Sequence, residues 1–330
     1  MMSSSRSGRF RGLVPLSVAV TAALTLGACS SGGENTPADD DGGCARTSTS
    51  AAAGVRPISI SPAAVTVLAP GDGERRVPAP EPDLQSPQQV QLSTESTEVS
   101  VAPGSDQEQA DPENGGVQNT VESLTVPLTA RAGCENTDDL EMTLGSPQSP
   151  DEALQPGLPA MDGTRSGVTY RDGLNPTSLR ILPADGSEAP AQRAVEQSLV
   201  NAFTHAVPLP TTAVGLGAHW RATRTVSSAI TVAQTIDVVL KRWTGRVLTL
   251  EVKVDESPAD STFRIPGSTE TLQVSRFANA GSGTLTVDLG RLLPTGGELT
   301  MAGARELVGA DPGRPILQRT GFTMSWKTAS

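Results

Sequence analysis

The 330-residue sequence has few of the residues from which most catalytic and metal sites are built. It contains two histidines, three cysteines and only 3% aromatic residues. Two imidazoles cannot supply the several histidine ligands of a typical catalytic zinc centre. The G-x-S-x-G, H-E-x-x-H and S-x-x-K patterns of serine hydrolases, zinc proteases and β-lactamases do not occur. The sequence therefore does not predict an enzyme, and we expect neither a metal nor another cofactor.

Positive charge and long apolar runs are scarce as well. Lys and Arg number 25 against 36 Asp and Glu, which gives a formal net charge of −11. Proteins that bind nucleic acid usually present a basic surface, so nucleic acid is not expected as a partner. The N-terminal apolar run, residues 13–26, is shorter than the roughly 20 residues that a membrane-spanning helix needs. A transmembrane anchor is therefore not predicted there.

The N-terminus has the pattern of an export signal. Three arginines, Arg6, Arg9 and Arg11, precede the apolar run, and small residues follow it. A charged start, a short apolar stretch and a small-residue cleavage site are typical of a signal peptide. We therefore expect residues 1–28 to be removed on export. The remaining chain would carry a formal net charge of −14, because the removed segment holds three arginines and no acid.

The residues at the end of this run are Leu26, Gly27, Ala28 and Cys29. They resemble the lipobox of bacterial lipoproteins. The resemblance implies cleavage before Cys29 and attachment of a diacylglyceryl group to its thiol, with Leu26 filling a peptidase pocket and Gly27 and Ala28 passing through a narrow groove. The chain would then be extracytoplasmic, held on the outer face of the cell membrane by lipid. The alternative is an ordinary signal peptide with an incidental cysteine.

The first half of the mature chain is strongly acidic. Residues 29–165 contain 22 acids and 6 bases, whereas residues 166–330 contain 14 acids and 16 bases. The acidic half is also rich in Pro, Ser, Thr and Gln, which bury little apolar surface. We expect a flexible acidic tether over residues 29–54 and poorly ordered acidic loops at about 70–120. A calcium site is disfavoured, because residues 39–41 lack the spaced ligands and glycine of an EF-hand loop.

Two cysteines remain once Cys29 is assigned to lipid. In an exported protein, Cys44 and Cys134 are most simply explained as a disulfide. A paired metal site or a redox couple is the alternative, although no C-x-x-C spacing or neighbouring histidine supports it. The disulfide would tie the end of the tether to a strand-like segment at residues 121–131.

Apolar and polar residues alternate along much of the chain after residue 55. The clearest example is residues 247–254, where every second residue is Leu or Val. A period of two indicates strands with one buried face. In a similar pattern at residues 124–131, Pro127 cannot donate a ladder hydrogen bond, so this strand is predicted to lie at a sheet edge.

One segment, residues 190–206, has a helical period instead. Its apolar residues recur at helical intervals between two prolines: Val195, Leu199, Ala202, Phe203 and Ala206. The predicted fold class is therefore mainly β (α+β): a curved antiparallel sheet or partial barrel with one amphipathic helix packed on it. Residues 55–330 are expected to form this β-rich domain.

Two glycine-containing motifs carry a second resemblance. Residues 210–220 read PTTAVGLGAHW, and residues 281–289 read GSGTLTVDL. Together they resemble an uncharacterised family of actinobacterial cell-envelope lipoproteins, loosely over residues 55–330 and more closely at the motifs. The family carries no assigned activity, so the resemblance implies the location only.

Two functions are compatible with these observations. The first is a carrier that binds a lipid or other hydrophobic molecule between sheet and helix, as the similarity to half-barrel envelope lipid carriers implies. Its expected lining is Leu199, Phe203, Ile236, Val238 and Leu250. The alternative is a structural lipoprotein that docks another envelope protein and has those residues closely packed, without a ligand cavity.

The remaining notable side chains are interpreted as structural. His205 lies at the end of the predicted helix, where a proton would favour the helix dipole. The carboxylate pairs Asp255–Glu256 and Asp138–Asp139 lie in polar sequence and are predicted to be solvated. Core or hairpin packing is expected for the three tryptophans: Trp220, Trp243 and Trp326.

Overall fold

The computed structural model describes residues 43–52, 54–101, 117–265 and 268–329. Within them the chain is mainly β with one α-helix, which confirms the predicted fold class. The helices are α1 (Ala189–Thr204) and two short 3-10 helices, η1 (Thr49–Ala51) and η3 (Leu158–Met161). The strands are β1 (Ile58–Ser59), β2 (Ala64–Ala69), β3 (Asp72–Arg76), β4 (Gln88–Val101), β5 (Val117–Ala132), β6 (Asp139–Leu144), β7 (Arg165–Arg171), β8 (Asn175–Leu182), β9 (Val214–Leu216), β10 (His219–Ser227), β11 (Thr231–Thr244), β12 (Val247–Pro258), β13 (Thr262–Arg264), β14 (Thr271–Asp288), β15 (Gly296–Val308) and β16 (Ile316–Thr328).

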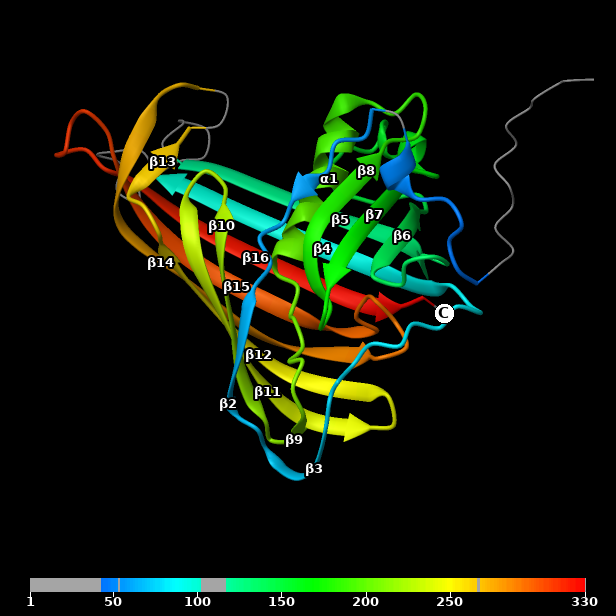
Figure 1. Ribbon diagram of the computed structural model, residues 1–330. Helices are drawn as coiled ribbons and strands as arrows, with labels where there is room; N and C mark the ends of the chain where they lie inside the picture. The colour runs from blue at the N-terminus through cyan, green and yellow to red at the C-terminus, as the bar shows by residue number, and fades with distance from the viewer. Residues whose placement is uncertain (1–42, 53, 102–116, 266–267, 330) are drawn as a thin grey trace, which may run out of the picture. The chain divides into compact units, whose positions relative to one another are not determined.

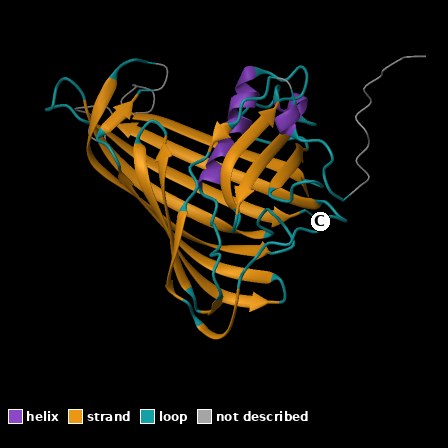
Figure 2. Cartoon of the chain, viewed as in Figure 1, coloured by secondary structure: helices purple, strands orange, loops and turns teal. Residues whose placement is uncertain are grey.

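Most strands belong to one antiparallel sheet that is not closed into a barrel. Its order is β1-β8-β7-β6-β5-β4-β16-β15-β14-β12-β11-β10-β2, with β13 beside β14, while β3 and β9 form a separate pair. The sheet curves around α1 (Figures 1 and 2). Among the described residues, no helix is both long enough and apolar enough to cross a bilayer.

The strand alternation places one apolar face of the sheet inside the curve. In β11 and β12, Ile236 lies opposite Val254 and Val238 lies opposite Val252, and all four are buried. Burial of such side chains contributes roughly 1.5 to 3 kcal/mol each. The concave face beneath α1 is therefore the hydrophobic core.

The helix closes this core with the stripe that its period predicts. Val195, Leu199 and Phe203 are buried against the sheet, and Pro190 lies in the first turn, where it interrupts no helical hydrogen bond. Halfway along the helix, Ser198 shares a hydrogen bond of 2.8 Å with Thr94 of β4. This bond satisfies two hydroxyl groups that would otherwise be buried without a partner.

The prediction that Pro127 marks an edge strand is wrong. Its strand, β5, pairs with β4 on one side and β6 on the other. Pro127 has no N–H to donate toward β6, but β6 ends at Leu144, so no strand residue lies opposite that nitrogen. The Pro127 carbonyl still accepts a hydrogen bond from Gly145 N–H at 2.9 Å. The missing N–H therefore removes no bond from the β5–β6 ladder.

Residues 58–69 connect the two edges of the sheet. β1 pairs with β8 at one edge, and β2 pairs with β10 at the other. Between them, the Asn175 side-chain amide accepts from Ala63 N–H at 2.9 Å and donates to the Ala63 carbonyl at 2.7 Å. The edges are joined by the chain rather than by a ladder of strand hydrogen bonds, so the sheet stays open.

The predicted disulfide between Cys44 and Cys134 is present. It attaches the N-terminal segment to the end of β5, where Ala45 N–H donates to the Ala132 carbonyl at 2.8 Å. The expectation that a flexible tether extends to residue 54 therefore does not fit residues 44–52. Residues 26–29, which carry the lipobox prediction, lie outside the described part of the chain.

A buried ion pair holds the same N-terminal segment. Glu141 of β6 accepts from Thr49 N–H at 2.9 Å and lies 3.3 Å from Arg180 Nη2 of β8. Arg180 Nε donates in turn to Thr49 Oγ1 at 3.1 Å. Residues 48–50 thus cover a charged pair on the face of the sheet opposite the core.

The expected loops at 70–120 are also partly regular. β3 and β4 lie within this range, and β4 pairs along its length with β16 and β5. The acidic composition did not prevent strand formation, because in β4 Val90 and Leu92 face the core while the charged residues follow later in the strand. Residues 102–116 lie outside the described part.

Candidate ligand-binding site

A row of polar residues crosses the concave face at right angles to the strands. Each member lies directly opposite the next in the strand register. We call it the polar row: Arg224 (β10), Gln234 (β11), Glu256 (β12), Asn279 (β14), Thr320 (β16) and Glu98 (β4), with Gly303 (β15) between Asn279 and Thr320. It separates the main core from a smaller apolar cluster built around Ile230, Phe263 and Leu307.

Glu256 is the centre of this row. Its carboxylate accepts from Gln234 Nε2 at 2.8 Å and from Asn279 Nδ2 at 2.7 Å, and it lies 3.7 Å from His205 Nε2. Burial acts to raise the pKa of Glu256, but His205, Gln234 and Asn279 together outweigh it and hold that pKa below its usual value. The carboxylate is therefore a fixed negative charge on the floor of the concave face.

Arg224 completes the row at its β10 end. Its Nε donates to Gln234 Oε1 at 2.8 Å and its Nη2 donates to the carbonyl of Ala206, just after α1, also at 2.8 Å. Burial lowers the pKa of Arg224 to about 10, although the charge of Glu256 opposes this. Arg224 thus ties the end of the helix to the row.

His205 lies above the row, where the helix ends. Its Nδ1 donates to the Asn201 carbonyl at 2.8 Å, and its ring stacks on Phe322 of β16 with centroids 4.8 Å apart. The predicted structural role at the end of the helix agrees with this position. The same ring also separates two hollows.

The first hollow is a groove of about 510 Å³ between α1 and the polar row. Its floor includes Glu256, Asn279 and Thr320, and its apolar wall includes Phe277 and Phe322. Small-molecule sites in proteins usually enclose roughly 300 to 1,000 Å³ and combine an apolar wall with a few polar groups. The groove has this size, but most of the side chains that line it are polar, so it fits the polar part of a ligand better than an apolar one.

The second hollow is an apolar cavity of about 40 Å³ on the other side of His205. Phe203, Met324 and Trp326 contribute to its wall. It is too small for an acyl chain as it stands. Met324 has an unbranched side chain that can change rotamer and so enlarge the cavity. The cavity therefore forms a narrow apolar neck next to the groove.

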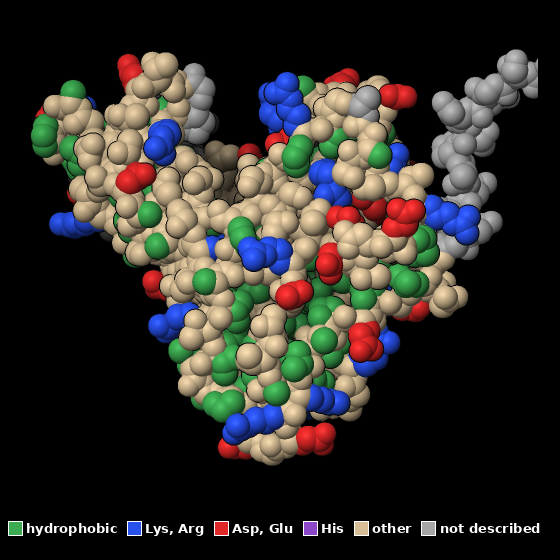
Figure 3. All heavy atoms as spheres, viewed as in Figure 1, with side chains coloured by type: hydrophobic (Ala, Val, Ile, Leu, Met, Phe, Trp, Pro, Cys, Tyr) green, Lys and Arg blue, Asp and Glu red, His purple; other side chains and the backbone are tan. Residues whose placement is uncertain are grey.

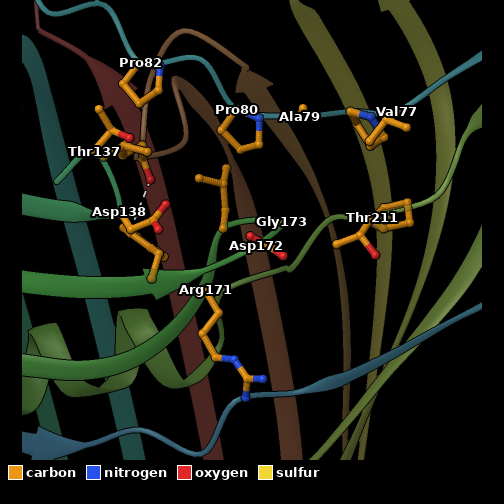
Figure 4. Close-up of a pocket in the computed structure, with 15 residues that line it drawn as sticks. Val77, Ala79, Pro80, Pro82, Thr137, Asp138, Arg171, Asp172, Gly173 and Thr211 are labelled. Atoms are coloured by element: carbon orange, nitrogen blue, oxygen red, sulfur yellow. Dashed lines mark hydrogen bonds between the residues drawn. The ribbon is translucent and has the colours of Figure 1, made fainter.

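The third hollow, of about 310 Å³, shares three wall residues with this neck: Tyr170, Leu174 and Leu292. Figure 4 shows Val77, Pro80 and Pro82 along one side of it. Leu174 is the non-glycine residue with a positive φ, 56°, among those described, and it follows the left-handed Gly173 in the β7–β8 turn. Backbone strain of this kind often accompanies binding sites.

The residues predicted to line a ligand cavity occupy two different environments. Leu199, Ile236, Val238 and Leu250 are fully buried within the main core. Phe203, from the same prediction, lines the apolar neck. Close packing, the alternative considered for this set, thus describes four of the five, because their side chains pack across the helix–sheet interface.

The other candidate residues have structural partners. His219 and Arg221 both contact Asp237, with His219 Nε2 3.2 Å from its Oδ1. Trp220 is buried and donates to the Pro208 carbonyl at 3.0 Å, as expected for core packing. Glu256, predicted to be solvated beside Asp255, instead has only 9% of its side chain exposed. Within the described ranges, His, Cys, Asp and Glu form no group of three that could hold a metal ion.

The sequence interpretation missed the polar row. The available signal was an interruption of the alternation: Glu256 follows Val252 and Val254, and Gln234 precedes Ile236 and Val238, on the same faces of their strands. Comparison of the chain with models of protein families finds no match, and no curated protein matches its sequence.

Proposed function

We propose that this protein is an extracytoplasmic lipoprotein, anchored through Cys29, that binds an amphipathic or otherwise hydrophobic ligand of the cell envelope. The observation that carries the proposal is that two cavities of different polarity share a wall residue. His205 lines both the ligand-sized groove on the polar row and the apolar neck. The proposal assigns the polar part of the ligand to the row and its apolar part to the neck.

The chemistry of the walls supports this division. Glu256 and Asn279 are held in place by neighbouring side chains, so they are pre-organised to meet hydroxyl or cationic groups. Phe203 and Trp326 contribute aromatic rings to the mostly apolar wall of the neck. The neck must widen to admit a chain, and the third hollow beyond Tyr170 and Leu174 gives the displaced side chains room.

A tryptophan in the groove should weaken ligand binding. Thr320→Trp places an indole on the polar row, and we expect the Kd of the probe N-phenyl-1-naphthylamine to rise at least about tenfold, or 1.4 kcal/mol. The matched control is Thr323→Trp on the opposite face of the same strand, which should leave the Kd unchanged. Fluorescence titration of the mature chain carrying Cys29→Ser measures both.

Mass spectrometry of lipids that co-purify with the same protein identifies the natural ligand. Equal probe binding by the two tryptophan variants, or no co-purified lipid in repeated preparations, would contradict the ligand-binding role and favour the structural alternative.

The lipid anchor is tested separately. Cys29→Ser should remove all palmitate label from the protein in cells grown with the labelled fatty acid, because Cys29 is the proposed site of acylation. Cys44→Ser should keep the label, since that cysteine forms the disulfide. Label retained by Cys29→Ser, or lost equally from both variants, would show that the anchor is assigned wrongly.

A further inference from the structure

Large apolar side chains are exposed together at one end of the sheet. Six such side chains are exposed in the described part of the chain, and four of them lie at this end. We call it the apolar end: Leu68, Val77, Leu216 and Val247, with exposed fractions of 48, 46, 49 and 37%. Apolar side chains gather in the lower part of the face in Figure 3, where Figure 1 places β3 and β9.

Contacts between distant parts of the chain assemble this end. β3 pairs with β9, and Gly215 N–H donates to the Pro70 carbonyl at 2.8 Å. The Arg76 guanidinium lies 4.2 Å from the centroid of the Trp243 ring, next to the β11–β12 turn. The apolar side chains are therefore held outward by ordered structure rather than left exposed on a loose loop.

The charges around the apolar end differ from those of the chain as a whole. Five acids lie next to it in sequence or in strand register: Asp72, Glu74, Glu81, Glu251 and Asp288. Five exposed cations balance them, namely Arg75, Arg76, Lys241, Arg242 and Arg246; Lys241 pairs with Glu251 at 3.2 Å and Arg246 lies 3.7 Å from Asp288. The mature chain is strongly acidic, so this local balance makes the apolar end less repelled by anionic lipid than the rest of the surface.

The chain enters the domain close to the same end. Gly43 lies against the backbone of Leu84 and Gln85, and residues 77–85 run from there to the apolar end. The 15 residues from Cys29 to Gly43 span at most about 50 Å when fully extended. A lipid on Cys29 would therefore hold Gly43 and its neighbours Leu84 and Gln85 within about that distance of the membrane.

We propose that the apolar end docks on the lipid bilayer, so that the hollow walled by Val77, Pro80 and Pro82 opens next to the membrane surface. This proposal rests on the proposed lipid anchor and specifies the source of the ligand as the bilayer itself. Apolar side chains flanked by Arg and Lys are the features that hold peripheral proteins at a membrane interface. A protein partner would not require the attachment point to lie nearby.

The test uses the mature chain, residues 29–330, with Cys29→Ser, so that no lipid is attached. Vesicles of equal parts phosphatidylglycerol and phosphatidylcholine should bind it in flotation assays. The triple variant Leu68→Glu/Val77→Glu/Leu216→Glu should lower the partition coefficient at least about tenfold. The matched control is Val121→Glu/Leu317→Glu, which changes the other two exposed apolar residues and should bind as the parent does.

Absence of vesicle binding by the parent, or an equal loss in the control, would overturn membrane docking. All five substituted side chains are exposed, so neither variant should unfold, and circular dichroism verifies this. Probe binding in the groove is measured without vesicles. Its result therefore separates failure of membrane docking from failure of the ligand-binding role.

Discussion

Replacing both Cys44 and Cys134 with alanine should lower the free energy of unfolding by about 4 to 5 kcal/mol. The disulfide closes a loop of 90 residues in sequence separation, which contains β1 to β5. Without it the unfolded chain gains conformational freedom, which lowers the stability of the folded state. Guanidinium denaturation of the unacylated mature chain gives the value.

Each single variant, Cys44→Ala or Cys134→Ala, should lose nearly as much stability as the pair, because either change breaks the same bond. The expected effect includes release of residues 44–52, which hydrogen exchange at Ala45 and Cys134 would report. A loss of less than about 1 kcal/mol in the double variant would mean that the remaining contacts of this segment suffice to hold it.

Arg180→Met should lower the free energy of unfolding by about 3 to 5 kcal/mol. The Arg180 and Glu141 side chains are only 5 and 10% exposed, and removal of the guanidinium leaves the Glu141 carboxylate buried without its counter-charge. Thr49 also loses its Arg180 donor, so the N-terminal segment should loosen together with the ion pair. Chemical denaturation measures the loss.

The exposed pair Arg221–Asp237 provides the matched control. Arg221→Met removes a guanidinium that donates twice to the Asp237 carboxylate, but its side chain is 46% exposed, so the loss should stay below about 1 kcal/mol. The double variant Arg180→Met/Glu141→Leu should recover part of the loss, because no unpaired charge remains. Equal losses from Arg180→Met and Arg221→Met would contradict the role assigned to burial.

Patterns within single elements were predictable from the sequence. The alternation at residues 247–254 correctly marked a strand with one buried face, and the helical period of Val195, Leu199 and Phe203 marked α1 within a few residues of its ends. These predictions succeed because a side chain's direction follows from its own backbone position. The disulfide was also predictable, since only two cysteines remained outside the lipobox.

The candidate site was much less predictable. Glu256 was interpreted as one of two solvated carboxylates, whereas three partners surround it: His205 just after α1, Gln234 of β11 and Asn279 of β14. No feature of residues 255 and 256 alone distinguishes the acid that is enclosed by partners from the exposed one. The strand register decides it, because it places Gln234, Glu256 and Asn279 opposite one another.

The sequence by itself determined which faces of the strands and helix are apolar, and that two thiols were available to cross-link the start of the domain. Only the tertiary structure decided the strand order, the open edges joined by residues 58–69, the ion pair between Glu141 and Arg180, and the polar row. The physical reason is that periodicity reports how each residue faces its own element, whereas a site or an ion pair depends on which distant elements meet.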